Sequence, residues 1–219
     1  MVKYSVSEEN YIKAIFHLQK EAEKVSTQEL SDLLQTKPAS VTDMMKKLKV
    51  KKLIDYKPYY GFSLSSLGNK IALGIVRRHR LWEYFLAEKL NFSWDEVHDV
   101  AEDLEHVSSK MLIDKLDAYL GHPKFDPHGD PIPDKDGKMG ENEFVCLTEL
   151  GLNKKAVVSQ ISSHSNKILE LLTHQQISIG AKLEIKKIFS FDGSMEVKVG
   201  KYPAAIISKQ LAKNIFVKI

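Results

Sequence analysis

The chain has 219 residues, enough for one to three small domains, and its 43% hydrophobic and 28% charged content is typical of a soluble globular protein. No apolar run is long enough to span a membrane, no signal-peptide core follows Met1, and the single Cys146 excludes an intrachain disulfide, so we expect a cytoplasmic protein with no membrane partner. The net charge of +3 is too small to indicate nucleic-acid binding by itself, so only the distribution of charge can do so.

The N-terminal segment begins with two helix signals. Ser7 can cap a helix whose apolar stripe occupies residues 11–18. Ser26 and Glu29 have the spacing of a capping box, in which each side chain satisfies a backbone amide of the other residue. We therefore expect a second, short helix through residues 30–34.

A third helix and a hairpin complete this segment. Pro38 suits the first position of the third helix, because the backbone N–H that it lacks has no partner there. This helix begins with small polar residues and ends with lysines. Residues 53–56 and 62–64 then alternate like the two strands of a hairpin. The order of helix, short helix, turn, basic helix and hairpin predicts a winged helix-turn-helix domain.

Such a domain binds double-stranded DNA through its third helix. A recognition helix needs small hydrogen-bonding residues at its N-terminus to reach base edges, and cations to contact phosphates. The candidate base readers are Ser40, Thr42 and Asp43. The candidate contacts to the DNA backbone are Thr36, Lys37, Pro38, Lys46, Lys47, Tyr59 and Tyr60. The alternative is that the lysines are only a solvated helix end; the agreement of charge, turn chemistry and hairpin favours DNA binding.

The middle of the chain predicts three helices. Residues 67–90 form one long apolar-periodic helix, and the capping-box pattern of Ser93 and Glu96 begins the next. A third helix covers residues 109–120. These helices carry more apolar surface than a linker needs, so we expect a subunit interface. Helix-turn-helix proteins are commonly two-fold dimers that read two half-sites, so the predicted partners are a second copy of the chain and an operator.

Four metal-ligand residue types share one predicted helix face. His98, Glu102, Glu105 and His106 are spaced by four, seven and eight residues, which places them within an arc of roughly 100°. Nitrogen and oxygen donors on a rigid element suit a divalent metal ion. The alternative is a solvated, salt-bridged helix face, which is what most charged stripes are.

Two further segments offer ligands. His79 and Glu83 lie one turn apart on the preceding helix and can face His98, although an isolated pair of this kind is usually only an ion pair. Residues 122–133 are rich in proline, glycine and acidic residues and predict an irregular loop. Asp126 and His128 in this loop can contribute ligands or serve turn chemistry.

The last part of the chain predicts a small β domain. Residues 144–147 and 215–217 are short strands, 183–188 and 195–199 alternate around a turn, and 168–172 suit a short helix. Residues 206–211 predict a helical turn. Closely spaced strands with tight turns fit a small SH3-like barrel. Cys146, with no partner cysteine, is interpreted as a small buried residue.

Together these motifs resemble the diphtheria toxin repressor family of metal-dependent repressors, over essentially the whole chain. The motifs are Pro38-Ala39-Ser40-Val41-Thr42, Arg78-His79-Arg80-Leu81-x-Glu83, Val97-His98-Asp99-x-x-Glu102-x-x-Glu105-His106 and the proline-rich run of residues 121–133. The resemblance implies a mainly α fold with a small β part. It divides the chain into a winged-helix domain of residues 1–72, a helical dimerisation and metal-binding domain of residues 73–142, and an SH3-like domain of residues 143–219.

The resemblance also implies two metal ions per subunit. The primary site matches Asn10, Glu102, Glu105 and His106, with Asp126 as a further ligand. The ancillary site matches His79, Glu83 and His98, completed by a residue of the C-terminal domain, for which His164 is the candidate. Iron-type members have cysteine where Glu102 stands, and manganese-type members have glutamate. The ligand set without sulfur favours Mn²⁺, with Fe²⁺ or Zn²⁺ as the alternatives.

The implied function is that of a transcriptional repressor and not of an enzyme. Mn²⁺ orders the homodimer so that its two winged-helix heads bind a palindromic operator of metal-uptake genes, with no small-molecule substrate. An iron- or zinc-responsive repressor of the same family is the first alternative. A two-metal hydrolase would leave the helix-turn-helix unexplained, and the sequence offers no nucleophile motif for it. An architectural DNA-binding protein with a structural metal predicts binding without reversible metal control.

Overall fold

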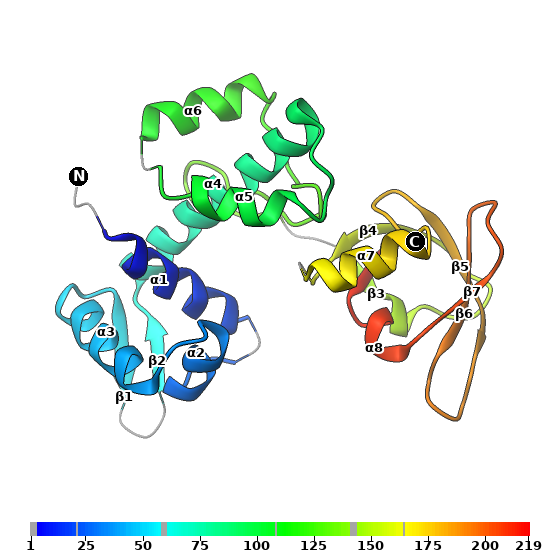
Figure 1. Cartoon of the computed structure of the whole chain (residues 1–219), viewed down its shortest axis with the longest axis horizontal. Helices are drawn as coiled ribbons and strands as arrows, with labels where there is room; N and C mark the ends of the chain where they lie inside the picture. Colours follow the sequence, from blue (N-terminus) through cyan, green and yellow to red (C-terminus); the bar gives the residue numbers. More distant parts are fainter. Residues whose placement is uncertain (1–3, 21, 58–60, 108, 141–143, 164) are drawn as a thin grey trace. The chain divides into compact units, whose positions relative to one another are not determined.

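The computed structural model describes residues 4–20, 22–57, 61–107, 109–140, 144–163 and 165–219 (Figure 1). The chain forms two compact units. The first unit comprises residues 1–79 with the short segments 105–108 and 133–138. The second unit comprises residues 80–104, 109–132 and 139–219. Among the described residues, no helix has the length and apolar character of a membrane span.

The first unit contains the predicted winged helix-turn-helix. Its elements are α1 (Val6–Leu18), α2 (Thr27–Leu33), α3 (Pro38–Val50), β1 (Ile54–Lys57) and β2 (Gly61–Leu64). The cap of α1 is Ser5 and not Ser7: the Ser5 hydroxyl accepts from the Glu8 amide at 3.2 Å, and the Glu8 carboxylate accepts from the Ser5 amide at 3.0 Å. The helix therefore begins earlier than predicted, because Glu8 completes a capping box only with Ser5.

The other signals of this unit are confirmed. Ser26 and Glu29 form the predicted capping box of α2, and Pro38 occupies the first turn of α3. The hairpin strands are antiparallel, with Ile54 opposite Leu64. Gly61 has a φ of +95°, and a β-carbon there would lie 2.4 Å from the Val25 carbonyl oxygen, so only glycine allows the wing to pair with the segment before α2. The core contains Ile12, Ile15, Leu30, Val41, Leu48 and Leu53, all fully buried.

Helix α4 (Ser66–Leu90) continues from the first unit into the second, which also contains α5 (Val97–Leu104) and α6 (Lys110–Tyr119). The prediction that His98, Glu102, Glu105 and His106 share one helix face is wrong. Helix α5 ends at Leu104, so Glu105 and His106 lie in the turn that follows it. The Glu105 carbonyl accepts from Arg78 Nε at 2.5 Å instead of continuing the helix. Segment 105–108 consequently belongs to the first unit.

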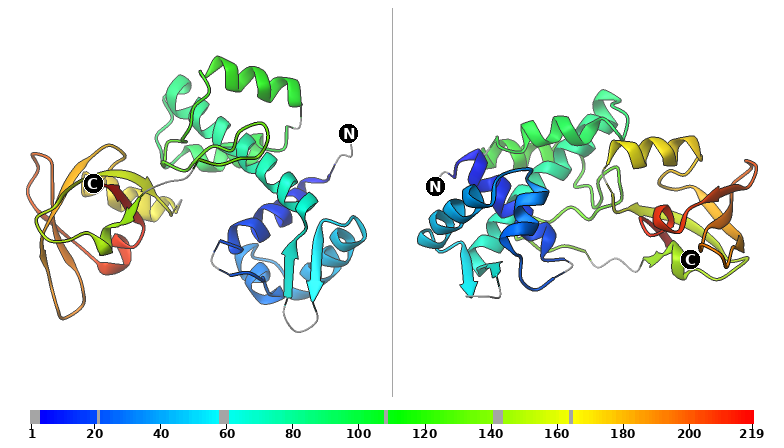
Figure 2. Two further views of the ribbon diagram at one scale, coloured as in Figure 1. Left: turned by 180° about the vertical axis from the view of Figure 1, so that it is seen from behind. Right: turned by 60° about the horizontal axis from the view of Figure 1, so that its bottom comes forward.

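The C-terminal part of the second unit is a six-stranded antiparallel sheet in the order β3-β8-β4-β5-β6-β7 (Figure 2). The strands are β3 (Val145–Cys146), β4 (Lys155–Ile161), β5 (Lys182–Ile188), β6 (Met195–Val199), β7 (Ala205–Ile207) and β8 (Ile215–Lys218). The short 3₁₀ helix Leu147–Glu149 and the helices α7 (Asn166–His174) and α8 (Lys209–Ala212) accompany the sheet. Its core packs Val158, Leu169, Ile185, Val197 and Ile215 together, all fully buried.

Three details of the C-terminal prediction are wrong. Strand β4 was not predicted, because a bulge between Val158 and Gln160 interrupts its alternation. Residues 206–211 are not one helical turn, since Ile206 lies in strand β7 and α8 follows. Cys146 is half-buried, with its Sγ 3.1 Å from the Thr148 hydroxyl.

Candidate metal centres and nucleic-acid interface

A first group of charged residues joins α1 to the turn after α5 within the first unit. This group, here called the α1 cluster, consists of Glu9, Lys13, Arg78, His79, Glu105 and His106. The Glu105 side chain is fully buried. Its two carboxylate oxygens lie 2.7 and 2.8 Å from Lys13 Nζ, and Oε2 also lies 2.6 Å from His79 Nδ1. The predicted ligand Glu105 is therefore held between a lysine and a histidine.

Glu9 forms the other half of the α1 cluster. Its Oε2 lies 2.7 Å from His106 Nδ1, and its Oε1 lies 3.0 Å from Arg78 Nη2. Sequence reasoning missed Glu9 and selected its neighbour Asn10, which is half-buried on α1. The contact of Glu9 with His106 spans 97 positions, so no local pattern in the sequence indicates it.

The electrostatics of the α1 cluster keep its buried carboxylate charged. Burial raises the pKa of Glu105, but the hydrogen bond from His79 and the charge of Lys13 outweigh it, so the pKa lies below its usual value. Two carboxylates, Glu9 and Glu105, face two permanent cations, Lys13 and Arg78. The cluster is thus close to neutral with these cations in place, and its oxygen and nitrogen donors suit a divalent metal ion.

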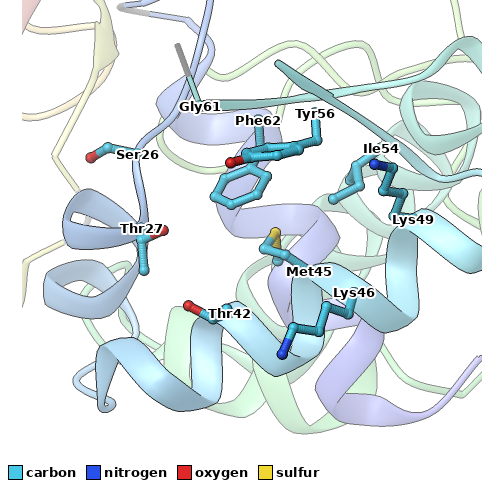
Figure 3. Close-up of a pocket in the computed structure, with 10 residues that line it drawn as sticks. All are labelled: Ser26, Thr27, Thr42, Met45, Lys46, Lys49, Ile54, Tyr56, Gly61 and Phe62. Atoms are coloured by element: carbon cyan, nitrogen blue, oxygen red, sulfur yellow. The ribbon is translucent and has the colours of Figure 1, made fainter. Parts of the chain in front are cut away.

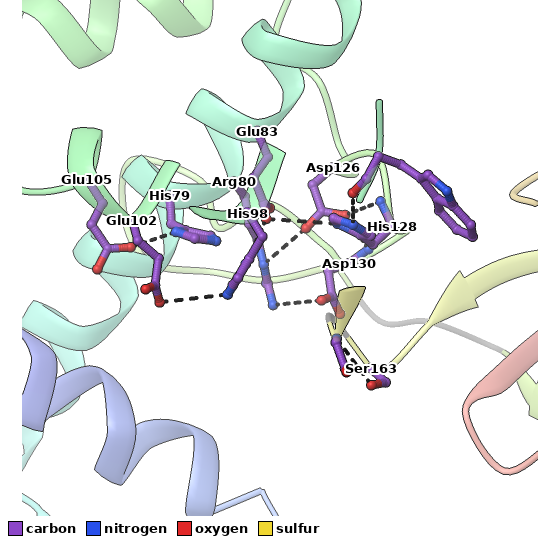
Figure 4. Close-up of polar contacts among 12 residues, drawn as sticks. His79, Arg80, Glu83, His98, Glu102, Glu105, Asp126, His128, Asp130 and Ser163 are labelled. Carbon is purple, nitrogen blue, oxygen red and sulfur yellow. Dashed lines mark hydrogen bonds and ion pairs between the residues drawn. The ribbon is translucent and has the colours of Figure 1, made fainter. Parts of the chain in front are cut away.

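A second group lies wholly within the second unit and is called here the loop cluster (Figure 4). It consists of Arg80, Glu83, His98, Asp126, His128 and Asp130. Glu83, Asp126 and His128 are buried, and each offers a ligand atom within 4.8 Å of the other two. His98 Nδ1 lies 3.2 Å from Glu83 Oε1. The structure therefore brings both loop candidates, Asp126 and His128, to the helix residue Glu83.

The loop that carries these ligands is fixed by the C-terminal sheet. Gly129 has a φ of +83°, and a β-carbon there would lie 2.0 Å from the Ser159 carbonyl oxygen of β4. Gln160 Nε2 donates to Asp130 Oδ1 at 2.6 Å, and the Ile161 amide donates to the His128 carbonyl at 2.9 Å. Strand β4, which the sequence did not predict, thus positions the loop of the metal centre.

The orientation of His128 follows from its backbone partner. His128 Nε2 lies 2.8 Å from the Trp94 carbonyl oxygen, which can only accept a hydrogen bond, so Nε2 carries the proton. The other ring nitrogen, Nδ1, lies 3.9 Å from Glu83 Oε1. A histidine whose second nitrogen is held by a carbonyl is the arrangement found for metal ligands in proteins.

The loop cluster contains more negative charge than its own cation balances. Arg80 is the guanidinium that contacts it, 3.5 Å from Asp126 and 3.4 Å from Asp130. Burial, followed by the charges of Glu83 and Asp130, raises the pKa of Asp126 well above its usual value, despite Arg80. The cluster thus holds three carboxylates and one arginine, and a divalent cation bound there would reduce the repulsion among the carboxylates. The donors are carboxylate oxygens and imidazole nitrogens, with no sulfur.

The other predicted ligands are distributed as follows. Of the predicted ancillary set, Glu83 and His98 lie together in the second unit, whereas His79 belongs to the first unit. His164 lies outside the described residues. Glu102 is exposed on α5, and its carboxylate lies 3.7 Å from His98 Nε2. Glu83 is a member of both the predicted ancillary set and the loop cluster.

Helix α3 presents the predicted DNA-reading residues to solvent. Val41, Met45 and Leu48 are buried at helical spacing, which turns the opposite face outward. That face exposes Lys37, Pro38, Ser40, Thr42, Asp43, Lys46 and Lys47, and Thr36 is half-buried before it. Tyr59 and Tyr60 lie outside the described residues.

A cavity of about 510 Å³ separates α3 from the wing (Figure 3). Its lining includes Ser26, Thr42, Lys46, Lys49 and Tyr56. Lys49 Nζ lies 5.3 Å from the centre of the Tyr56 ring. Ser26, Lys49 and Tyr56 are candidate contacts that the sequence analysis did not name: Ser26 caps α2, Lys49 lies in the last turn of α3, and Tyr56 lies in β1. A hollow with hydroxyls and ammonium groups suits an anionic backbone.

Comparison with known proteins matches three consecutive segments of the chain to family models. Residues 3–62 match the family model "Iron dependent repressor, N-terminal DNA binding domain", residues 65–134 match "Iron dependent repressor, metal binding and dimerisation domain", and residues 145–219 match "FeoA domain". The chain is 34% identical over 120 residues to the HTH-type transcriptional regulator MntR of Oceanobacillus iheyensis, covering 55% of this chain and 81% of that protein. It is 27% identical over 174 residues to the iron-dependent repressor IdeR of Mycobacterium leprae, covering 75% and 76%.

Solved structures agree with this assignment. A manganese-dependent transcriptional repressor in complex with manganese matches with a TM-score of 0.86 and 33% identity, covering 96% of this chain and 98% of that one. The manganese regulator SloR matches with a TM-score of 0.79 and 26% identity, covering 100% and 99%. The predicted fold, with its winged helix, helical domain and SH3-like domain, is confirmed. The chain belongs to the diphtheria toxin repressor family of metal-dependent transcriptional repressors, which are DNA-binding proteins and not enzymes.

Proposed function

We propose that this protein is a manganese-activated repressor that acts as a homodimer in the cytoplasm. Two Mn²⁺ ions per subunit favour the arrangement in which both winged-helix heads bind a palindromic operator of metal-uptake genes. The observation that carries the proposal is the buried loop cluster, where Asp126 and Asp130 share the guanidinium of Arg80, and the buried Glu83 carboxylate lies with Asp126 and His128. Such an excess of buried carboxylate is costly unless a cation accompanies it.

The choice of manganese rests on the donor chemistry. Both clusters offer carboxylate oxygens and imidazole nitrogens, which suit a hard divalent ion. Cys146 lies in β3 beside Thr148 and belongs to neither cluster. The names of the similar proteins support both metals, since SloR is a manganese regulator and IdeR is an iron-dependent repressor. Fe²⁺ and Zn²⁺ are therefore the alternatives.

For the ligands we propose two sets. In the α1 cluster, Glu9, Glu105 and His106 bind the first ion, with Asn10 of the same helix as a further candidate ligand. The second ion binds in the loop cluster, to Glu83, Asp126 and His128. His79, His98, Glu102 and His164 remain proposed further ligands of these two ions.

The proposed mechanism follows from the elements that the α1 cluster connects. Glu9 lies on the first helix of the DNA-reading head, whereas Glu105 and His106 follow a helix of the dimerisation domain. An ion supplies a double positive charge that both elements share, so it favours the state in which the two are held together. Metal acts only through its higher affinity for that state, and such coupling is typically worth about 1–3 kcal/mol.

Binding of labelled promoter DNA from the protein's own locus tests the proposal. Fluorescence anisotropy is measured at fixed salt with chelator, Mn²⁺, anaerobic Fe²⁺ and Zn²⁺ in parallel. We expect Mn²⁺ to increase affinity by about 5- to 150-fold over chelator, the range that corresponds to typical allosteric coupling. Equal binding with and without any metal would overturn metal control. Strong activation by Fe²⁺ with none by Mn²⁺ would overturn the choice of manganese and leave the family function intact.

Two variants assign the response to the two clusters. Glu105→Gln and Asp126→Asn each remove one ligand charge while keeping the side-chain shape, so both should lose the response to Mn²⁺. Asp103→Asn, an exposed residue of α5, is the matched control and should respond like the unchanged protein. An undiminished response in Asp126→Asn would remove the loop cluster from the mechanism.

A further inference from the structure

The positive charge of this DNA-binding protein is concentrated in its C-terminal domain. Residues 144–219 contain eleven lysines and five carboxylates, a formal charge of +6, whereas the rest of the chain carries −3. No part of the proposed metal mechanism uses these lysines. A domain whose charge exceeds that of the whole chain is an electrostatic footprint for a polyanion.

Four of these lysines gather on one face of the sheet. The strand registers place Lys218, Val157 and Lys182 in one row across β8, β4 and β5. The neighbouring row consists of Lys155, Glu184 and Lys198 across β4, β5 and β6. Lys155, Lys182, Lys198 and Lys218, here called the lysine face, line a hollow of about 390 Å³. The opposite side of the same strands supplies the buried core residues Ala156, Leu183 and Val199.

The single carboxylate in these rows does not cancel their charge. Glu184 Oε1 lies 2.6 Å from Nζ of Lys186, which stands where the pairing of β5 with β6 is interrupted by a bulge. Lys198 Nζ donates to the Tyr202 carbonyl. Lys155, Lys182 and Lys218 are exposed at the rim of the hollow. The lysine face therefore retains a surplus of mobile ammonium groups.

We propose that the lysine face binds the phosphate backbone of DNA that flanks the operator. Lysines two strands apart in a row are separated by about 10 Å at the backbone, and their long side chains can adjust to phosphate positions along a duplex. The face has ammonium groups and few side-chain groups able to read base edges, so it adds affinity without sequence preference. The occupant is DNA because this is the polyanion that the family's winged-helix domain already binds. Tethering to the head raises the local concentration of the second contact.

The test uses the full-length protein with three exposed lysines of the face replaced, Lys155→Gln, Lys182→Gln and Lys218→Gln together. Lys198 is left unchanged because it bonds to the Tyr202 carbonyl. The matched control replaces Lys167, Lys209 and Lys213, exposed lysines of the same domain on and beside α7 and α8, by Gln. Both variants lose the same net charge, so any difference between them reports position. A Lys→Arg version of the first variant keeps the charge and should restore binding.

Binding is measured with two duplexes across a range of salt concentrations. One duplex covers the two half-sites, and the other extends the same site by about two helical turns on each side. On the long duplex, the slope of log K against log salt should decrease in magnitude by about 2.7 for three lost phosphate contacts. The control should retain the slope, and the short duplex should show no difference between the two variants.

Three results would overturn the proposal. Equal slopes for the two variants on the long duplex would show that position on the sheet is irrelevant. An equal loss on both duplexes would place the effect at the head. If sedimentation shows that the dimer of the first variant dissociates while the salt slope is unchanged, the partner of the lysine face is a second copy of the chain and not DNA. The same comparison of salt slopes is made for non-specific DNA in the presence of chelator, where no metal is needed. Failure of the manganese proposal is therefore distinguishable from failure of this one. Circular dichroism confirms that each variant is folded.

Discussion

Replacement of Lys13 by methionine tests two effects of its positive charge: stabilisation of the buried Glu105 carboxylate and competition with a metal ion for it. Lys13 Nζ lies 2.7 and 2.8 Å from the two oxygens of Glu105. The Lys13 side chain is 13% exposed, and that of Glu105 is fully buried. The substitution keeps most of the apolar volume of the side chain and removes its charge. It leaves a buried carboxylate beside two histidines, with His79 Nδ1 at 2.6 Å and His106 Nε2 at 3.7 Å.

The magnitude follows from this burial. Breaking a buried ion pair by removal of one partner costs about 3–5 kcal/mol, because the remaining charge is uncompensated. The hydrogen bond between His79 Nδ1 and Glu105 Oε2, at 2.6 Å, offsets part of the loss. We therefore expect the metal-free variant to lose about 2–3 kcal/mol of unfolding free energy, below the full cost of a broken pair. A metal ion no longer competes with the ammonium group, so Mn²⁺ affinity should rise by about tenfold, which equals 1.4 kcal/mol.

The assay combines urea unfolding of the metal-free protein with calorimetric titration of Mn²⁺. Lys115→Met, an exposed position of α6, is the control and should change neither quantity. Stability should fall and affinity should rise together in Lys13→Met. A variant with lower stability and lower Mn²⁺ affinity would refute the reasoning, because Lys13 would then orient Glu105 for the metal instead of competing with it.

Three further predictions concern other parts of the molecule. Asp126→Asn relieves repulsion with Glu83 and Asp130, so the metal-free protein should keep its stability or gain up to about 1 kcal/mol. The rise in melting temperature on addition of Mn²⁺ should be smaller than in the unchanged protein. A large loss of metal-free stability would contradict the charge argument. Burial raises the pKa of Glu8, but hydrogen bonds from Lys51 and Ser5 hold it below its usual value. This carboxylate therefore contributes stability to the fold above its unfolded pKa. The contribution is lost as the pH falls through the lower pKa of the folded protein. Urea unfolding of Glu8→Gln should accordingly depend less on pH below 4.5 than that of the unchanged protein, and equal pH profiles would count against the assignment. Lys47→Ala should weaken binding to all DNA sequences and reduce the salt slope by about 0.9, whereas an effect on the operator alone would make Lys47 a base reader.

The fold was predictable where local signals agree with tertiary structure. The capping box of Ser26 and Glu29 and the position of Pro38 each act within a few residues, so the sequence alone determines them. Strand β4 was missed because its bulge at Ser159 breaks the two-residue period that identifies strands. The cap of α1 was misplaced because two serines precede the same apolar stripe, and only Glu8 distinguishes them.

The site was predictable in its residue types and not in its grouping. A spacing of seven or eight residues is compatible with one helix, but it cannot show that the helix ends at Leu104. The bond from Arg78 to the Glu105 carbonyl comes from 27 positions earlier in the chain, beyond the range of any local pattern. Glu9 was hidden because its contact with His106 spans 97 positions. His128 gained its role from Trp94 and β4, which are also distant in sequence.

If the loop cluster binds an ion as we propose, the attachment of its loop to β4 makes the C-terminal domain a participant in metal affinity. Gln160 bonds to Asp130, and the next residue, Ile161, bonds to the backbone of His128, so a rearrangement of this strand is felt by the ligands of the loop cluster. Linkage is reciprocal: if occupancy of the sheet domain by a polyanion changes the affinity of the loop for its ion, the ion changes the affinity for the polyanion by the same factor. The domain that has no base-reading element can therefore set the metal concentration at which the repressor responds.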